Sequence, residues 1–289
     1  MVTPAARTPR TLFVYKVSGM DTAEIRGRQI ARELGCDTMR LRELTPETAA
    51  RYDVVVYVKR PAERRVLEEI RRRGVRQVLD PLDNYGWREI GRAARHLDAF
   101  IGANLTHAVH LRRRFGLPAA EIPHHHCNFD ELRIPRRTPP TLGFISTPDH
   151  WPMNRRLAER TGYPAVSNVS RKGERGFERL VEAYLSVDVG FVYRMRPEKM
   201  RFNCANKLTN YMSFGIPSVL TPESGFLEYG RHGETVLYAH TKEDFVDLLR
   251  WLAADTDLRM RMSDACYDAA RPFHISRIAE RYREFLASL

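Results

Sequence analysis

VDVGFVYRMRPEKMRFNCANKLTNYMSFGIPSVL, residues 187–220, is the stretch that decides the fold. Its first part, 187–193, is an apolar run of the kind found in strands that are buried on both faces of a parallel sheet. A helix is predicted at 206–214, because Gly215 is a typical helix stop. A second short strand follows at 217–220. Strand, helix and strand in this order predict a βαβ unit with parallel strands.

The same alternation extends outward in both directions. Further strands are predicted at 11–17, 52–59, 75–80, 97–103, 120–123, 141–146, 163–169 and 234–238, with helices between most of them and after the last. The alternation breaks at DELRIPRRTPP, residues 130–140, whose three prolines indicate a linker. The predicted fold class is therefore α/β, with two Rossmann-like domains at 1–134 and 135–289 and a cleft between them. The last helix is expected to be able to pack back on the first domain.

Composition narrows the range of functions. The chain is 43% hydrophobic and 29% charged, near the averages for soluble globular proteins. No apolar run approaches the ~18 residues of a membrane span, and the first residues lack the apolar core of a signal peptide, so a cytoplasmic protein is expected. Four cysteines occur singly, which indicates neither a disulfide framework nor a zinc ribbon.

The net charge of +11 suggests an anionic ligand, an acidic membrane surface or nucleic acid. Two short arginine clusters, at 71–73 and 112–114, are either part of such a surface or solvated helix faces. No basic stripe with interleaved aromatic residues stands out. Charge alone therefore does not choose the partner.

The loop that leaves the strand at 187–193 is crowded with cations, which precede a predicted helix N-terminus. Lys207 lies in the first turn of that helix, where it opposes the helix dipole unless an anion lies in front of it. A diphosphate is the natural ligand of such a site, although an ordinary solvated basic loop would show the same sequence pattern. The residues predicted to hold it are Arg194, Arg196, Lys199, Arg201, Asn206 and Lys207.

The segment NKLTNYMSFGIPSVLTPESGFLEYGRHGETVLYA, residues 206–239, resembles the donor-binding segment of GT-B glycosyltransferases. The resemblance is to the large retaining family 4 type (glycosyl transferases group 1), which includes sucrose-phosphate and mannosyl transferases. It is specific over 188–238, moderate over 98–130 and only architectural elsewhere. The matching residues are Lys207, Leu208, Tyr211, Met212, Gly215, Pro217, Val219, Thr221, Gly225, Glu228, Gly233 and Glu234.

This resemblance implies a glycosyltransferase that moves a sugar from a nucleoside-diphosphate sugar to an acceptor hydroxyl, with no metal or other cofactor. Asn210 lies at the position where the family has a glutamate that binds the ribose. Phe202 lies at the position where the family has a second glutamate, which recognises the sugar. Both departures leave the identity of the donor open. The remaining implied contacts are Ser167, Asn168, Val169 and Ser170 with the base, and Ser224, Gly225, Phe226 and His124 with the sugar or its loop.

Sugar transfer needs positive charge that stabilises the leaving diphosphate. An inverting enzyme also needs a base that removes the proton of the acceptor hydroxyl. The candidates for that base are Asp80, Asp83 and Asp21, which follow predicted strands; each could instead form an Asx-turn or a helix cap. Three adjacent histidines begin at His124, but neighbours in an extended chain point in alternate directions, so a metal site is not expected.

Two other functions share this fold: a sugar-nucleotide epimerase-like isomerase, and a non-catalytic nucleotide-sugar binding protein. The acceptor is open between a small molecule, a lipid-linked compound and a nucleic acid. A basic face would also suit peripheral association with an anionic membrane.

Overall fold

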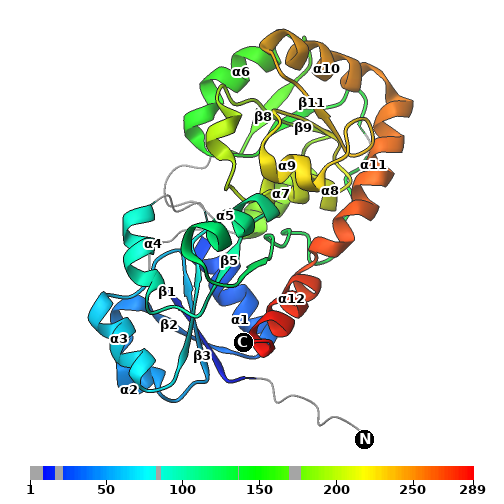
Figure 1. The fold of residues 1–289 in the computed structure, drawn as a ribbon. Coiled ribbons are helices and arrows are strands. Elements are labelled where there is room, and N and C mark those ends of the chain that lie inside the picture. Colours follow the sequence, from blue (N-terminus) through cyan, green and yellow to red (C-terminus); the bar gives the residue numbers. More distant parts are fainter. Residues whose placement is uncertain (1–8, 17–21, 83–85, 136, 169–176) are drawn as a thin grey trace, which may run out of the picture. The chain divides into compact units, whose positions relative to one another are not determined.

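The computed structural model describes residues 9–16, 22–82, 86–135, 137–168 and 177–289. The chain divides into two compact units, each built on a parallel sheet (Figure 1). The first unit comprises Met1–His124, Phe202–Cys204 and Ile275–Leu289, and the second His125–Arg201 and Ala205–His274. The change from one unit to the other at 124–125 comes before the predicted boundary at 134. The final helix is assigned to the first unit.

The first unit contains a six-stranded sheet in the order β2-β1-β3-β4-β5-β6. Its central strand, β3, is buried along its whole length, in keeping with the continuous apolar run in its sequence. β2 was not predicted, because DTMR forms an edge strand with mostly exposed side chains and lacks an apolar run. The strands are β1 (Thr11–Tyr15), β2 (Asp37–Arg40), β3 (Val54–Val58), β4 (Arg76–Asp80), β5 (Ala99–Gly102) and β6 (Ala119–Glu121).

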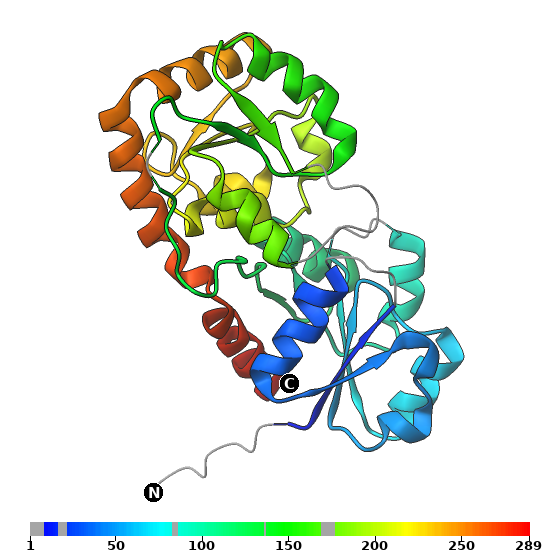
Figure 2. The same cartoon turned by 180° about the vertical axis from the view of Figure 1, so that it is seen from behind.

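Helices cover both faces of this sheet. Figures 1 and 2 show α1 and α12 together on one side of it, with α2, α3 and α4 on the other. Gly102 lets α5 approach closely, because a Cβ at this residue would lie 2.4 Å from the backbone nitrogen of Ala108. The helices are η1 (Ala23–Gln29, a π-helix), α1 (Ile30–Leu34), η2 (Leu41–Glu43), α2 (Pro46–Ala49), α3 (Arg64–Arg72), α4 (Trp87–Ala94), α5 (Leu105–Phe115) and α12 (Ile275–Ala287).

The second unit contains a five-stranded sheet in the order β11-β10-β9-β7-β8, which is also parallel. Its strands are β7 (Leu142–Phe144), β8 (Ala165–Ser167), β9 (Val189–Val192), β10 (Ser218–Leu220) and β11 (Val236–Tyr238). The helices are η3 (Pro148–His150), α6 (Trp151–Glu159), α7 (Phe177–Leu185), η4 (Pro197–Met200), α8 (Asn206–Ser213), α9 (Ser224–Tyr229), α10 (Lys242–Ala254), α11 (Thr256–Ala270) and η5 (Arg271–Phe273).

Tyr211 fixes α8 against the second sheet. Its hydroxyl donates to the Gly143 carbonyl at 2.9 Å and accepts from the Ile145 amide at 3.0 Å. Its ring covers Gly190, where an added Cβ would lie 2.5 Å from the ring. These contacts join α8 to β7 and β9 and so set where the first turn of α8 lies.

Two helices of the structure begin close to residues that favour other starts. α3 begins at Arg64, three residues after Pro61, although proline is typical of the first turn of a helix. The polar loop after β10 is short, because α9 starts at Ser224.

Candidate functional site

The carboxyl edge of the second sheet brings together charged residues from separate stretches of sequence. Arg194 follows the end of β9, and Glu223 lies between β10 and α9. The Arg194 Nε atom lies 3.1 Å from Glu223 Oε1, and the two side chains are only 7% and 3% exposed. Ligands of parallel α/β sheets bind at this edge. Glu223 was not singled out from the sequence, where its only signal is its place in the short polar loop after β10.

Lys207 and His150 belong to the same cluster. Burial raises the pKa of the Glu223 carboxyl, and the positive charges of Arg194 and Lys207 oppose that rise. Burial, followed by the same two cations, lowers the pKa of the His150 imidazole. Because a carboxylate and an imidazole both respond to Arg194 and Lys207, the two cations act on one small region.

The first turn of α8 faces this cluster without a side-chain cap. Its N-cap residue is Ala205, which has no side-chain acceptor, so the first amides of the helix are not satisfied by a cap. Thr221 Oγ1 is also buried without a hydrogen-bond partner among the described residues. Amides at a helix start, two cations and a buried hydroxyl are groups that can bind a phosphate.

The other predicted diphosphate ligands are more exposed. Arg196, Lys199 and Arg201 lie on the surface at or beside η4, and Asn206 is the partly buried first residue of α8. Arg194 differs from this group because it is buried. The structure thus brings Arg194 and Lys207 to the same charged cluster, whereas the other loop cations lie exposed on the protein surface.

The two departures from the family pattern have structural explanations. Asn210 Oδ1 accepts a 2.8 Å hydrogen bond from the Cys127 amide, and its side chain also bonds Tyr184. Its amide therefore holds the fold together, and a contact with ribose stays a prediction. Phe202 belongs to the first unit, where it is buried and stacks on His107 with ring centroids 5.0 Å apart. It also meets Trp87 edge to face.

Asp80, one of the predicted bases, lies in a buried ion pair. Both it and Arg26 are fully buried, and Asp80 Oδ2 lies 2.6 Å from Arg26 Nη2 and 2.9 Å from the Tyr282 hydroxyl. Arg26 also donates to the carbonyls of Ile122 and Pro123. A base must reach the proton that it removes, and the burial of Asp80 disfavours such contact. Sequence could not show this network, because its members come from distant elements.

The remaining predicted residues are placed as follows. Ser167 ends β8, and Asn168 follows it with a buried Oδ1 that has no hydrogen-bond partner among the described residues. Ser224, Gly225 and Phe226 form the first turn of α9, and His124 is buried at the end of the first unit. The predictions for Asp21, Asp83, Val169 and Ser170 lie outside the described residues.

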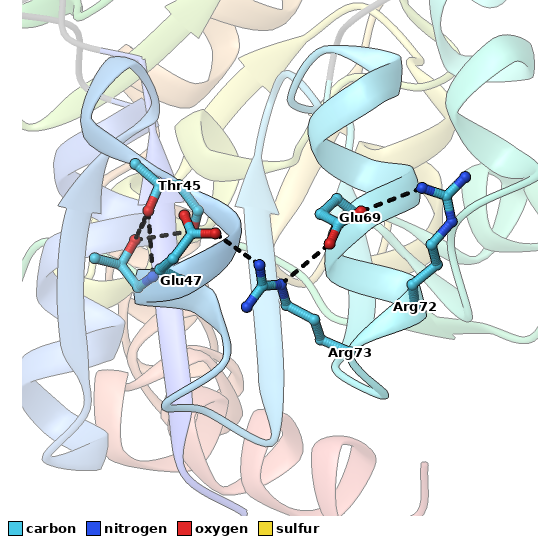
Figure 3. A network of polar contacts seen from close by, with 6 residues as sticks. Thr45, Glu47, Glu69, Arg72 and Arg73 are labelled. Carbon is cyan, nitrogen blue, oxygen red and sulfur yellow. Dashed lines mark hydrogen bonds and ion pairs between the residues drawn. The ribbon is translucent and has the colours of Figure 1, made fainter.

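One arginine cluster of the first unit is a surface ion-pair network (Figure 3). Arg73 lies 2.6 Å from Glu47 at the start of α2, and 3.5 Å from Glu69 on its own helix. Arg72 also pairs with Glu69, at 3.2 Å. Neighbouring carboxylates thus offset these two positive charges, which favours a solvated helix face over a binding surface for a polyanion.

The described part of the chain lacks both a metal site of protein ligands and a membrane-spanning helix. Within it, no group of three or more His, Cys, Asp or Glu side chains is arranged to hold a metal ion. No helix there is both long and apolar enough to span a membrane.

The chain is similar to known proteins in both sequence and fold. The model of a family described as glycosyl transferase-like matches residues 138–287, just over half of the chain. No curated protein sequence matches significantly. The structure of HepE from Anabaena in complex with UDP-glucose has a TM-score of 0.72 and 13% identity, covering 97% of this chain and 100% of that one. Sucrose-phosphate synthase from Thermosynechococcus elongatus has a TM-score of 0.70 and 12% identity, with the same coverage.

A third similar structure is the pneumococcal O-GlcNAc transferase GtfA in complex with UDP and GlcNAc. Its TM-score is 0.61 at 13% identity, and the match covers 81% of this chain and 56% of that one. At such identities the likeness shows the fold alone. The predicted fold of two Rossmann-like domains is confirmed.

Proposed function

Since the chain belongs to the glycosyl transferase-like family and is a glycosyltransferase, we propose that its donor is a nucleoside-diphosphate sugar held at the carboxyl edge of the second sheet. The observation that carries this proposal is the cluster of Arg194, Lys207 and the uncapped first turn of α8. These groups present positive charge where a diphosphate would lie.

Such a cluster suits the chemistry of sugar transfer. The bond between the anomeric carbon and the diphosphate oxygen breaks, and the acceptor oxygen forms the new bond to that carbon. The diphosphate leaves with the bonding electrons, and the hydroxyl proton passes to a base or to solvent. Cations and helix amides that are already in place stabilise the charge that develops on the leaving group. The proposal needs no metal ion for this step.

Uracil is the nucleobase to test first. HepE was solved with UDP-glucose and GtfA with UDP and GlcNAc, and both share the fold of this chain. Ser167 and Asn168, at the end of β8, are the described residues proposed to contact the base. The buried Oδ1 of Asn168 would gain a partner from an N–H donor of the base.

The acceptor and its base are less defined. With Asp80 in a buried ion pair, Asp83 and Asp21 remain the proposed bases. A small-molecule, lipid-linked or nucleic-acid acceptor, association with an anionic membrane, and a cytoplasmic location all stay predictions from the sequence.

Ligand binding to Lys207→Ala tests the donor site. UDP at about 100 times its Kd should stabilise the wild type by about 2.7 kcal/mol, and the variant should lose most of this gain. Lys242→Ala is the matched control, because Lys242 is an exposed lysine in the first turn of α10, whose N-terminus is capped by Thr241. It should respond to UDP as the wild type does. If no nucleoside diphosphate stabilises the wild type, the proposed donor site is wrong.

Product analysis then separates transfer from the two other functions. Incubation with a UDP-sugar and candidate acceptors should release UDP only when an acceptor is consumed. A new UDP-sugar isomer formed without acceptor would indicate an epimerase-like isomerase. Binding of the donor without any turnover across the acceptor panel would favour a non-catalytic binding protein.

A further inference from the structure

Glu223 is an unexpected residue at a proposed anion site. A buried carboxylate beside a diphosphate repels it, and burying a charge is costly unless the charge is paired. The residue occupies the N-cap position of α9, yet its side chain makes no cap hydrogen bond to that helix. Capping therefore does not explain why a carboxylate is present here.

The contact that Glu223 does make is a buried ion pair with Arg194, whose two facing atoms do not meet hydrogen-bond geometry. Its Oε1 atom lies 3.1 Å from Nε of Arg194, at the inner edge of the guanidinium. A guanidinium has five N–H groups, and Nε supplies only one of them. Among the described residues, no hydrogen bond or ion pair is found for the two terminal nitrogens of Arg194. Those nitrogens form the fork that binds phosphate oxygens in pairs.

We propose that Glu223 is a positioning residue, which holds the Nε edge of Arg194 so that the terminal nitrogens face the diphosphate of the donor. This inference rests on the proposed function. It gives Glu223 no contact with the substrate, in keeping with its burial. It also explains why a site for an anion contains an acid: the carboxylate orders a side chain that would otherwise adopt many rotamers.

Isothermal titration of UDP into four forms of the full chain tests this inference: wild type, Glu223→Gln, Arg194→Ala and the double variant. Glutamine keeps the size of the side chain and removes its charge. We expect Glu223→Gln to weaken UDP binding about tenfold, because the fork of Arg194 is no longer held in place. We expect the double variant to bind UDP no more weakly than Arg194→Ala alone, because Glu223 acts only through Arg194.

Asp188→Asn is the control for a merely structural effect. Asp188 is a buried carboxylate that directly precedes β9. It therefore lies at the amino ends of the strands, whereas the proposed donor site lies at their carboxyl ends, and it pairs with Arg137 at 3.2 Å. It should lose stability in urea as Glu223→Gln does, yet bind UDP with wild-type affinity. Equal losses of UDP affinity in the two variants would overturn the inference, because general destabilisation would then explain both.

Other outcomes are equally decisive. Unchanged or tighter UDP binding by Glu223→Gln, or a further loss in the double variant, would overturn the positioning role and leave the donor site intact. If Glu223→Gln does not fold, Arg194→Lys gives the same answer: its single nitrogen cannot serve both Glu223 and the diphosphate, so it should bind UDP about as weakly as Arg194→Ala. Wild-type affinity in Arg194→Lys would overturn the inference. A wild type that binds no nucleotide would overturn the proposed function as well.

Discussion

Replacing Asp80 by asparagine keeps the size of the side chain and removes its charge. In the wild type, Asp80 Oδ2 lies 2.8 Å from Nε and 2.6 Å from Nη2 of Arg26, and it accepts a hydrogen bond from the Tyr282 hydroxyl. Both charged side chains have no exposed surface. Asp80→Asn would therefore leave the Arg26 guanidinium buried without its counter-charge.

The loss of stability follows from these contacts. Removing one partner of a buried ion pair costs about 3–5 kcal/mol, because the other charge stays buried and uncompensated. Arg26 would keep its hydrogen bonds to the carbonyls of Ile122 and Pro123, at 2.8 and 2.7 Å. We therefore expect a loss near the lower end, about 3 kcal/mol, which is a large part of the 5–15 kcal/mol that is typical of a domain.

Urea unfolding at neutral pH measures this loss, and turnover per folded molecule is measured alongside it. The matched control is Asp53→Asn, since Asp53 is about half exposed and lies 3.9 Å from the exposed Arg10. The control should lose no more than about 1 kcal/mol. An Asp80→Asn protein that is as stable as the wild type, binds UDP normally and has lost its turnover would refute this reasoning and restore Asp80 as the base.

Three further predictions concern stability. Burial, with the charges of neighbouring histidines, lowers the pKa of His126 in the folded chain from 6.5 to about 3. As the pH falls below about 6.5, this histidine therefore binds a proton in the unfolded chain but not in the folded one. The wild type should thus be about 2 kcal/mol less stable at pH 5 than at pH 7 in urea titrations, and His126→Leu should lack most of that slope. Gly143→Ala should cost about 1–3 kcal/mol by thermal unfolding, because its Cβ would lie 2.3 Å from the Val187 side chain. Thr241→Ala removes the cap of α10 and should cost about 1 kcal/mol, with Thr241→Ser close to wild type in the same assay.

Much of the architecture was predictable from local sequence. Buried strands such as β3 and β9 carry continuous apolar runs, and Gly215 marks the end of the helix before β10. β2 escaped prediction because an edge strand with exposed side chains carries no such run. The start of α9 at Ser224 was not predicted, because the polar residues and the glycine around it favour a loop when only the local sequence is considered.

The candidate site was predicted in part. The pattern of cations before a helix start pointed to Arg194 and Lys207, and in the structure both charges act on Glu223, because strand ends and helix starts meet at one edge of a parallel sheet. Their contact with a diphosphate stays a prediction. Glu223 was missed, since nothing local distinguishes a buried acid from a surface one. Asn210 was assigned by its position in a motif, whereas its amide bonds the Cys127 backbone from a distant segment.

The sequence by itself determined the alternation of strands and helices, the parallel sheets and the edge at which a ligand would bind, because periodicity and chain order dictate these features. Only the tertiary structure decided which charges are buried and with what they pair. Asp80 meets Arg26 and Tyr282, and Arg194 meets Glu223, from segments far apart in the chain. The energy of a charged group depends on its burial and its partners, and neither is encoded in the residues next to it.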